Sequence, residues 1–139
     1  MRSALIRYSC VAMLLVSALG LDVRTDDQDI QVVQMTAKKY EFSPAHVHVK
    51  LGMKVQLKIT AIDRDHGFTI VRDPVSDDSS PHPGLVFTVP PGSDGWRLRK
   101  GKETMIEFVA RAPGTYNFDC SLICGLHHGR MKGQLMVDP

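Results

Sequence analysis

A twelve-residue segment near the C-terminus, 120–131, concentrates side chains that bind metals. It contains two thiols, an imidazole and a thioether, spaced as Cys120-x3-Cys124-x3-His128-x2-Met131. Thiolates and thioethers are soft ligands and imidazole is borderline, a set that suits copper better than calcium, magnesium or manganese. The segment precedes the last apolar run, 134–137, so we expect a loop between the final two strands. The sequence therefore predicts a copper site on this loop.

This spacing resembles the ligand loop of the CuA domain found in subunit II of cytochrome c oxidases and in nitrous oxide reductase. The family pattern is Cys-x-Glu-x-Cys-Gly-x-x-His-x-x-Met, and Gly125 fits it as well. The middle Glu of the family is Leu122 in this chain. Far upstream, His66 lies in a segment similar to the family's Asp-x-x-His-Ser-Phe/Trp, with Gly67 in the place of Ser.

The resemblance implies a centre of two copper ions bridged by both thiolates. One ion would also take His66 and Met131, and the other His128 and the backbone carbonyl of residue 122. Because that last ligand is main chain, Leu122 need not break the site. The complete set of metal ligands that the resemblance implies is His66, Cys120, Leu122, Cys124, His128 and Met131.

The implied function is the transfer of single electrons through a mixed-valence CuA centre. The redox partner would be a c-type cytochrome or an oxidase subunit. We expect no enzyme activity from the domain alone, because nothing resembles an acid–base pair or an activated nucleophile; it would count as an oxidoreductase only within a terminal oxidase. Leu122 favours a free-standing carrier over a standard oxidase subunit II, since its side chain cannot bind the further metal that the family's Glu faces. Apolar neighbours are expected to exclude water from the site: Phe68, Leu122, Ile123 and Leu126.

Short alternating or apolar runs with Gly and Pro between them predict an all-β fold, an antiparallel Greek-key sandwich of about eight strands. In 54–61, for example, Val55, Leu57 and Ile59 share one face. Residues 73–84 and 90–101 carry loop signals. The Pro-Gly-x-Tyr at 113–116 and the Tyr-Glu-Phe-Ser-Pro at 40–44 are similar to cupredoxins, so the resemblance covers roughly 30–139.

The N-terminus has the features of a secretory signal peptide over residues 1–20, with Arg2 and Arg7 before an apolar run and Ala18-Leu-Gly20 at its end. An uncleaved N-terminal anchor is the alternative, and would be the only membrane contact. Residues 21–29 are expected to be a flexible lead-in and 30–139 the copper-binding domain. Removing 1–20 lowers Lys+Arg from 17 to 15 and leaves Asp+Glu at 15. A near-neutral chain argues against nucleic-acid binding, and the leader predicts a periplasmic or other extracytoplasmic location.

Other hypotheses remain open from the residues alone. Cys120 and Cys124 would allow a small disulfide in an oxidising compartment, although it closes a very short loop. A mononuclear blue copper site would use only one cysteine. A copper carrier or chaperone would hold exchangeable metal, and a short oxidase subunit II would need the N-terminal anchor. A structural zinc site from two cysteines and two histidines satisfies a tetrahedron but leaves Met131 unexplained.

The other histidines have simpler interpretations. His46 and His48 share one side of a strand, and an exposed strand face is expected there. His82 lies in a Pro-rich loop and is expected to be solvated. His127 competes with its neighbour His128 for the ligand role, and the spacing favours His128. Trp96 is either a core residue or a docking aromatic.

Overall fold

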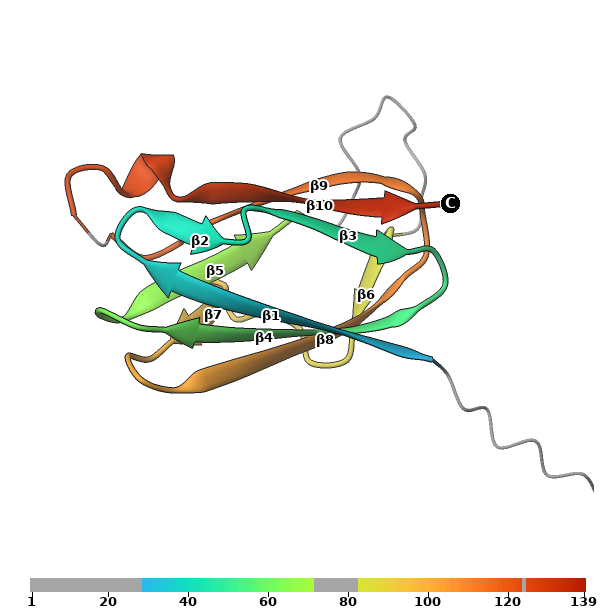
Figure 1. The fold of residues 1–139 in the computed structure, drawn as a ribbon, viewed down its shortest axis with the longest axis horizontal. Helices are drawn as coiled ribbons and strands as arrows, with labels where there is room; N and C mark the ends of the chain where they lie inside the picture. Colours follow the sequence, from blue (N-terminus) through green and yellow to red (C-terminus); the bar gives the residue numbers. More distant parts are fainter. Residues whose placement is uncertain (1–28, 72–82, 124) are drawn as a thin grey trace, which may run out of the picture.

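The computed structural model describes residues 29–71, 83–123 and 125–139, and these form a β-sandwich. The predicted leader and nearly all of the lead-in lie outside the described residues. One five-stranded sheet has the order β2-β1-β4-β8-β6, from Glu41–Ser43, Ile30–Lys38, Lys54–Ala61, Glu103–Ala110 and Leu85–Phe87. The other has the order β3-β10-β9-β5-β7, from His46–Lys50, Lys132–Asp138, Gly114–Asp119, His66–Ile70 and Trp96–Leu98. Figure 1 shows the long strands β1, β4, β8, β9 and β10 running close to the long axis, whereas the short strand β6 crosses it.

The core lies between the two sheets and is built by residues that alternate along each strand. In β4 the buried positions are Val55, Leu57, Ile59 and Ala61, which confirms the predicted inward face. Successive strand residues point to opposite faces, so this period-2 pattern buries one face and leaves the other in contact with solvent. Aromatic rings fill the second sheet's inner face, where Phe68 and Phe118 lie 5.3 Å apart between ring centroids.

The predicted sandwich is confirmed, but its strands are not all antiparallel. β1 pairs with β4 in parallel, with Ile30 opposite Lys54, and β3 pairs with β10 in parallel, with Gln134 opposite His46. The chain leaves the first sheet after β2, contributes β3 to the second sheet, and returns as β4. That excursion places β4 beside β1 with the same direction, whereas two strands joined by a direct hairpin must be antiparallel.

Two strands were not predicted from the sequence. β2 pairs antiparallel with the end of β1, with Lys38 opposite Glu41. β7 lies within the predicted loop 90–101 and pairs with β5, with His66 opposite Leu98. A single turn of 3-10 helix, His128–Arg130, is the helical element in the described part of the chain. None of the helices there is long and apolar enough to span a membrane.

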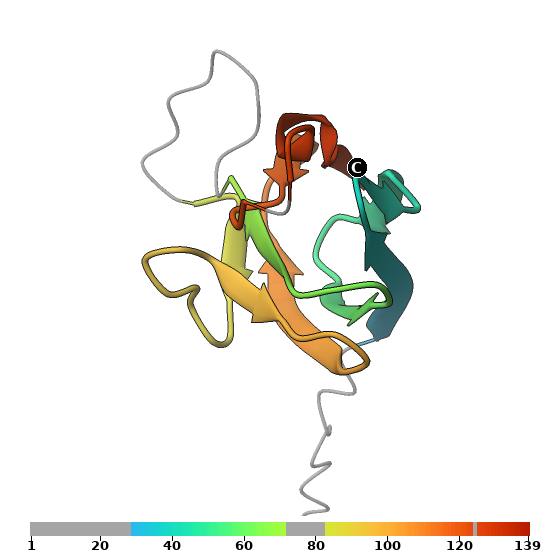
Figure 2. The same cartoon turned by 90° about the vertical axis from the view of Figure 1, so that its left-hand side faces the viewer.

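Four segments, which include turns, the short strand β7 and neighbouring strand ends, meet at one end of the sandwich, the left end in Figure 1, which faces the viewer in Figure 2. They are residues 38–41, 62–65, 92–103 and 119–132, and we call this the loop end. Backbone bonds tie them together: Ile62 N donates to Ala37 O over 3.0 Å, and Gly101 N donates to Ala61 O over 2.7 Å. The predicted copper loop, 119–132, thus lies at the same end of the sandwich as three segments that are bonded to one another.

Candidate metal centre

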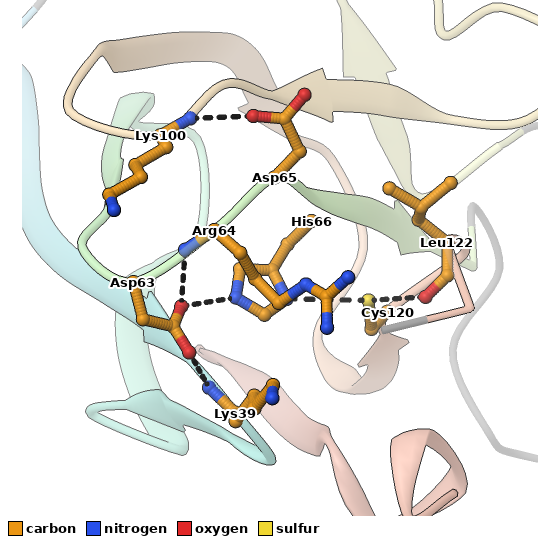
Figure 3. Close-up of polar contacts among 8 residues, drawn as sticks. All are labelled: Lys39, Asp63, Arg64, Asp65, His66, Lys100, Cys120 and Leu122. Carbon is orange, nitrogen blue, oxygen red and sulfur yellow. Dashed lines mark hydrogen bonds and ion pairs between the residues drawn. The ribbon is translucent and has the colours of Figure 1, made fainter. Parts of the chain in front are cut away.

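His66 is the first residue of β5 and is completely buried. Its Nε2 lies 2.7 Å from Oδ1 of Asp63 (Figure 3). A carboxylate accepts hydrogen bonds and does not donate them, so Nε2 carries the ring proton. The other nitrogen, Nδ1, is therefore left with its lone pair, which is the form in which imidazole binds a metal.

Asp63 is itself fixed by the backbone around it. Its Oδ2 accepts from Lys39 N and its Oδ1 from Arg64 N, each over 2.8 Å. Partial burial opposes ionisation, but the hydrogen bonds from His66, Lys39 and Arg64 outweigh it and hold the pKa of Asp63 below its ordinary value. Asp63 is thus an anchored carboxylate that sets the orientation of the His66 ring.

Cys120 follows β9 directly and is 4% exposed. Its Sγ lies 4.0 Å from Nδ1 of His66, the nitrogen that carries the lone pair. The thiol also donates to the carbonyl oxygen of Leu122 over 3.1 Å (Figure 3). Three donors of the predicted set, an imidazole nitrogen, a thiol sulfur and a main-chain oxygen, therefore converge on one buried place.

These separations fit atoms that share a metal. Metal–sulfur and metal–nitrogen bonds of about 2.3 and 2.0 Å, as measured for zinc, place the two donor atoms up to about 4 Å apart. The donor types are soft or borderline, which favours copper or zinc over oxygen-seeking cations. The residues that are described thus fit the predicted ion.

Met131 closes the loop from its other end. It is completely buried, and its carbonyl oxygen accepts from Cys120 N over 3.0 Å. That bond joins the first and last residues of the predicted ligand loop. Cys124 and the side chain of His128 lie outside the described residues. Among the side chains that are described, no group of three or more His, Cys, Asp or Glu gathers around one point.

Gly67 permits the ligand loop to lie against β5. A Cβ built on Gly67 would collide with Ser121 Oγ and would come within 2.7 Å of Leu122 N. Ser121 in turn donates to the carbonyl oxygen of Asp94 over 2.5 Å. The loop is therefore fastened between β5 and the 92–95 turn, which fixes the carbonyl of Leu122 near Cys120.

The opposite flank of the loop contacts the turn between β1 and β2. Tyr40 adopts a φ of +93°, in the left-handed region that aromatic residues rarely occupy. Its ring meets His127 edge-on with 5.2 Å between centroids, and its hydroxyl lies 2.8 Å from where a Cβ of Gly125 would be. Gly125 has a φ of +139°, which also favours glycine. The exposed His127 thus contacts Tyr40 on the surface.

The expected apolar shell is only half present. Phe68 is completely buried and Leu122 is partly buried against the core, as predicted. Ile123 and Leu126 instead have exposed fractions of 79% and 98%. The prediction that these two exclude water from the site is therefore wrong, because their part of the loop extends away from the sandwich instead of folding over it.

The other histidines agree with their simpler interpretations where they are described. His46 and His48 are exposed, and His48 Nδ1 lies 3.0 Å from Asp138 Oδ2. His82 lies outside the described residues. Trp96 is partly buried on β7 and its ring packs against Phe87, with 5.0 Å between centroids. Its place is at the edge of the core.

Sequence reasoning missed the residues that support the ligands. Asp63 stands three positions before His66, inside the segment compared with the Asp-x-x-His pattern, and that pattern was the available signal. Ser121 carries no such signal, because a serine beside a cysteine is common and its partner is the backbone of Asp94, 27 residues away.

The sequence is similar to two proteins of known function. Nitrous-oxide reductase of Stutzerimonas stutzeri is 30% identical over 129 residues, which cover 86% of this chain and 17% of that protein. Cytochrome c oxidase subunit 2 of Thermus thermophilus is 24% identical over 105 residues, which cover 76% of this chain and 64% of that protein. The chain thus spans less than two thirds of either relative.

The fold also matches a solved structure, the periplasmic domain of subunit II of cytochrome oxidase (CoxB) of Bradyrhizobium japonicum. The TM-score is 0.54 at 15% identity, covering 78% of this chain and 83% of that one. At that identity the likeness supports the fold alone. Residues 10–137 match the cupredoxin-like domain, which is most of the chain. With the sandwich, the loop end and this match together, the chain belongs to the cupredoxin-like domain family.

Proposed function

We propose that this protein carries single electrons through a binuclear, thiolate-bridged CuA centre at the loop end. The proposal rests on the donors gathered around Cys120 Sγ. His66 Nδ1 lies 4.0 Å from the sulfur, and the carbonyl oxygen of Leu122 lies 3.1 Å from it. The loop spacing adds Cys124, His128 and Met131 as the remaining ligands. When bound, two copper ions with shared thiolates supply a one-electron redox centre whose unpaired electron is spread over both metals.

The residues of the chain prepare this site in three ways. Asp63 holds the proton on Nε2 of His66 and so directs Nδ1 toward the sulfur. The Cys120 thiol directs its proton to the Leu122 carbonyl, and loss of that proton frees both the sulfur and the oxygen as donors. Ser121 and Gly67 hold the loop against β5.

A packed β-sandwich suits electron transfer because it resists rearrangement. His66 and Met131 are completely buried and Cys120 is nearly so, within a core packed at the density of organic crystals. Ligands held in this way move little when charge changes, and a small movement lowers the barrier to transfer. The proposed function is thus electron transport rather than conversion of a substrate.

A second candidate is the electron-entry domain of a short oxidase subunit II. The match to the subunit 2 of Thermus thermophilus favours it. Leu122 opposes it, because a leucine side chain binds neither a metal nor a proton. In both cases we propose a periplasmic location, consistent with the leader-like N-terminus, and a c-type cytochrome or an oxidase subunit as partner.

The deciding experiment is copper reconstitution of the 21–139 protein, with metal analysis, optical spectra and electron paramagnetic resonance. We expect two coppers per chain and a hyperfine pattern from one electron shared by two copper nuclei. Hyperfine splitting from a single nucleus would instead indicate a mononuclear site. Tight zinc, or copper lost readily to chelators, would reject the electron carrier in favour of a structural or metal-delivery role. The Cys124→Ser variant should lose the shared-electron signal, because one bridge is gone.

A further inference from the structure

The loop end carries an excess of positive charge that the composition of the whole chain conceals. Its four segments hold nine Lys or Arg and six Asp or Glu, although 21–139 as a whole is formally neutral. The cations are Lys38, Lys39, Arg64, Arg97, Arg99, Lys100, Lys102, Arg130 and Lys132. The acids are Glu41, Asp63, Asp65, Asp94, Glu103 and Asp119. The charges come from turns far apart in sequence that meet in Figure 2.

Several of these acids are engaged by groups within the protein. Asp63 accepts from His66 and from two backbone amides. Asp65 Oδ1 accepts from Lys100 N over 2.9 Å and its Oδ2 from Arg97 over 3.1 Å (Figure 3 shows the first bond). Lys38 and Glu41 form an ion pair at 2.8 Å. The two ion pairs, Arg97–Asp65 and Lys38–Glu41, each remove one charge of either sign, so the excess of three positive charges at the loop end is unchanged.

We define the basic rim as Lys39, Arg99, Lys100, Lys102 and Arg130, all of which are exposed. Lys39 adjoins Tyr40, whose ring contacts His127 of the ligand loop. The backbone N–H of Lys100 donates a hydrogen bond to the Asp65 carboxylate, which holds Lys100 beside the 62–65 turn, and Lys102 N donates to Arg99 O over 3.0 Å. Arg130 is on the ligand loop itself. The rim therefore flanks the proposed metal centre from several sides.

The loop end also carries exposed apolar side chains. Ile123 and Leu126 of the ligand loop are largely or wholly exposed, and Ile62 on the neighbouring turn is 51% exposed. Beside Leu122, between the loop and the 92–97 segment, is a hollow of about 240 Å³ that is partly lined by Trp96. Exposed aliphatic groups on a surface that also carries charged residues are typical of protein interaction sites.

We infer that the loop end is a docking surface for an acidic redox protein, one whose negative groups surround an apolar contact at its own redox centre. The inference rests on the proposed function, because only a metal centre behind Leu122 gives the partner a reason to dock there. Charge complementarity favours a partner with a negatively charged surface and raises the rate at which the two proteins associate. Apolar contact then brings Leu122, whose carbonyl is a proposed ligand, close to the partner. A basic cytochrome would be repelled.

The test is stopped-flow electron transfer between the copper-loaded 21–139 protein and two c-type cytochromes, one acidic and one basic. We expect the acidic cytochrome to react faster at low salt, and its rate to fall as salt rises from about 10 mM to about 0.3 M, where screening shortens the reach of charge to below 10 Å. Lys100→Glu/Lys102→Glu should slow that reaction about tenfold at low salt, within the range of electrostatic steering.

The matched control is Lys50→Glu/Arg111→Glu, which makes the same change of charge at the far end, where both residues are exposed. It should leave the rate nearly unchanged. An unaltered copper spectrum in both variants shows that the fold and the centre persist. If the unsubstituted protein shows no CuA signal, the proposed function is rejected. If the signal is present but the basic cytochrome reacts faster than the acidic one, only the docking surface is rejected. The docking surface would also be overturned if the protein bound phosphatidylserine vesicles and Lys100→Glu/Lys102→Glu abolished that binding without changing the rate of electron transfer with either cytochrome.

Discussion

Asp63 and His66 form a hydrogen bond of 2.7 Å that decides which nitrogen of the buried imidazole faces Cys120. The carboxylate is fixed in turn by the amides of Lys39 and Arg64, so two turns, 38–41 and 62–65, hold one ring. A ligand oriented before the metal arrives loses little freedom on binding, which raises affinity. The support around His66 is therefore as much a part of the site as the ring itself.

Replacement of this carboxylate should weaken metal binding. In Asp63→Ala, the His66 ring loses the partner that fixes its tautomer, and we expect copper affinity to fall about 10- to 100-fold. Competition with a chelator of known affinity measures it. Asp65→Ala is the control, because Asp65 also accepts a backbone amide but does not contact His66. Equal losses in the two variants would contradict the role assigned to Asp63.

The contact between β5 and the ligand loop should tolerate no side chain at position 67. In Gly67→Ala, the new methyl group collides with Ser121 Oγ and approaches Leu122 N to 2.7 Å. We expect a loss of about 1–3 kcal/mol in the free energy of unfolding and an altered copper spectrum. Gly129→Ala, in the same loop with open space around it, should change neither. A normal spectrum in Gly67→Ala would show that the loop position is not critical.

Met131 can be tested as a ligand separately from its place in the core. Met131→Leu conserves volume, so the free energy of unfolding of the metal-free protein should change by less than about 1.5 kcal/mol. The reduction potential of the copper form should nevertheless shift, because a thioether donor tunes the metal. Met35→Leu, at another buried methionine, should leave the potential unchanged. An unchanged reduction potential in Met131→Leu would show that Met131 contributes to core packing and is not a ligand.

Glu107 should contribute to stability in a pH-dependent way. Hydrogen bonds from Gln56, Thr88 and Lys54 hold the pKa of its carboxyl below its ordinary value. As pH falls, the unfolded chain therefore takes up a proton first, near about pH 4.3. The contribution is present above that pH and is lost as pH falls through the lower folded pKa. Between about pH 6 and about pH 3, the Tm of the unsubstituted protein should fall more steeply than that of Glu107→Gln. Parallel curves would contradict this.

The sequence predicted those parts of the fold that have a clear local period. β4 and β8 alternate over eight residues each, and β4 has the bounds expected from the sequence, 54–61. β2 and β7 have only three residues each, too few to show a period, and β7 follows a Gly- and Pro-rich stretch. The parallel pairs were missed because strand direction depends on which sheet each strand joins, which no local pattern records.

For the candidate site, the sequence indicated donors and the structure added their supports. Spacing alone selected Cys120 and Met131, since both lie on one short loop. The role of Asp63 depends on the tautomer of a distant ring, and the basic rim depends on four turns meeting in space. Neither could be predicted from the sequence, because composition and net charge carry no information about where residues lie in the folded protein.

The separation of His66 and Cys120 has a consequence for biogenesis. The two residues are 54 positions apart, yet β5 and β9 pair directly, with Thr69 opposite Asp119. Before β5 and β9 pair, the chain offers the proposed loop ligands without the imidazole, and we expect it to hold copper weakly. The sheet must close first, and metal insertion is then a late step whose binding energy adds to the stability of the finished protein.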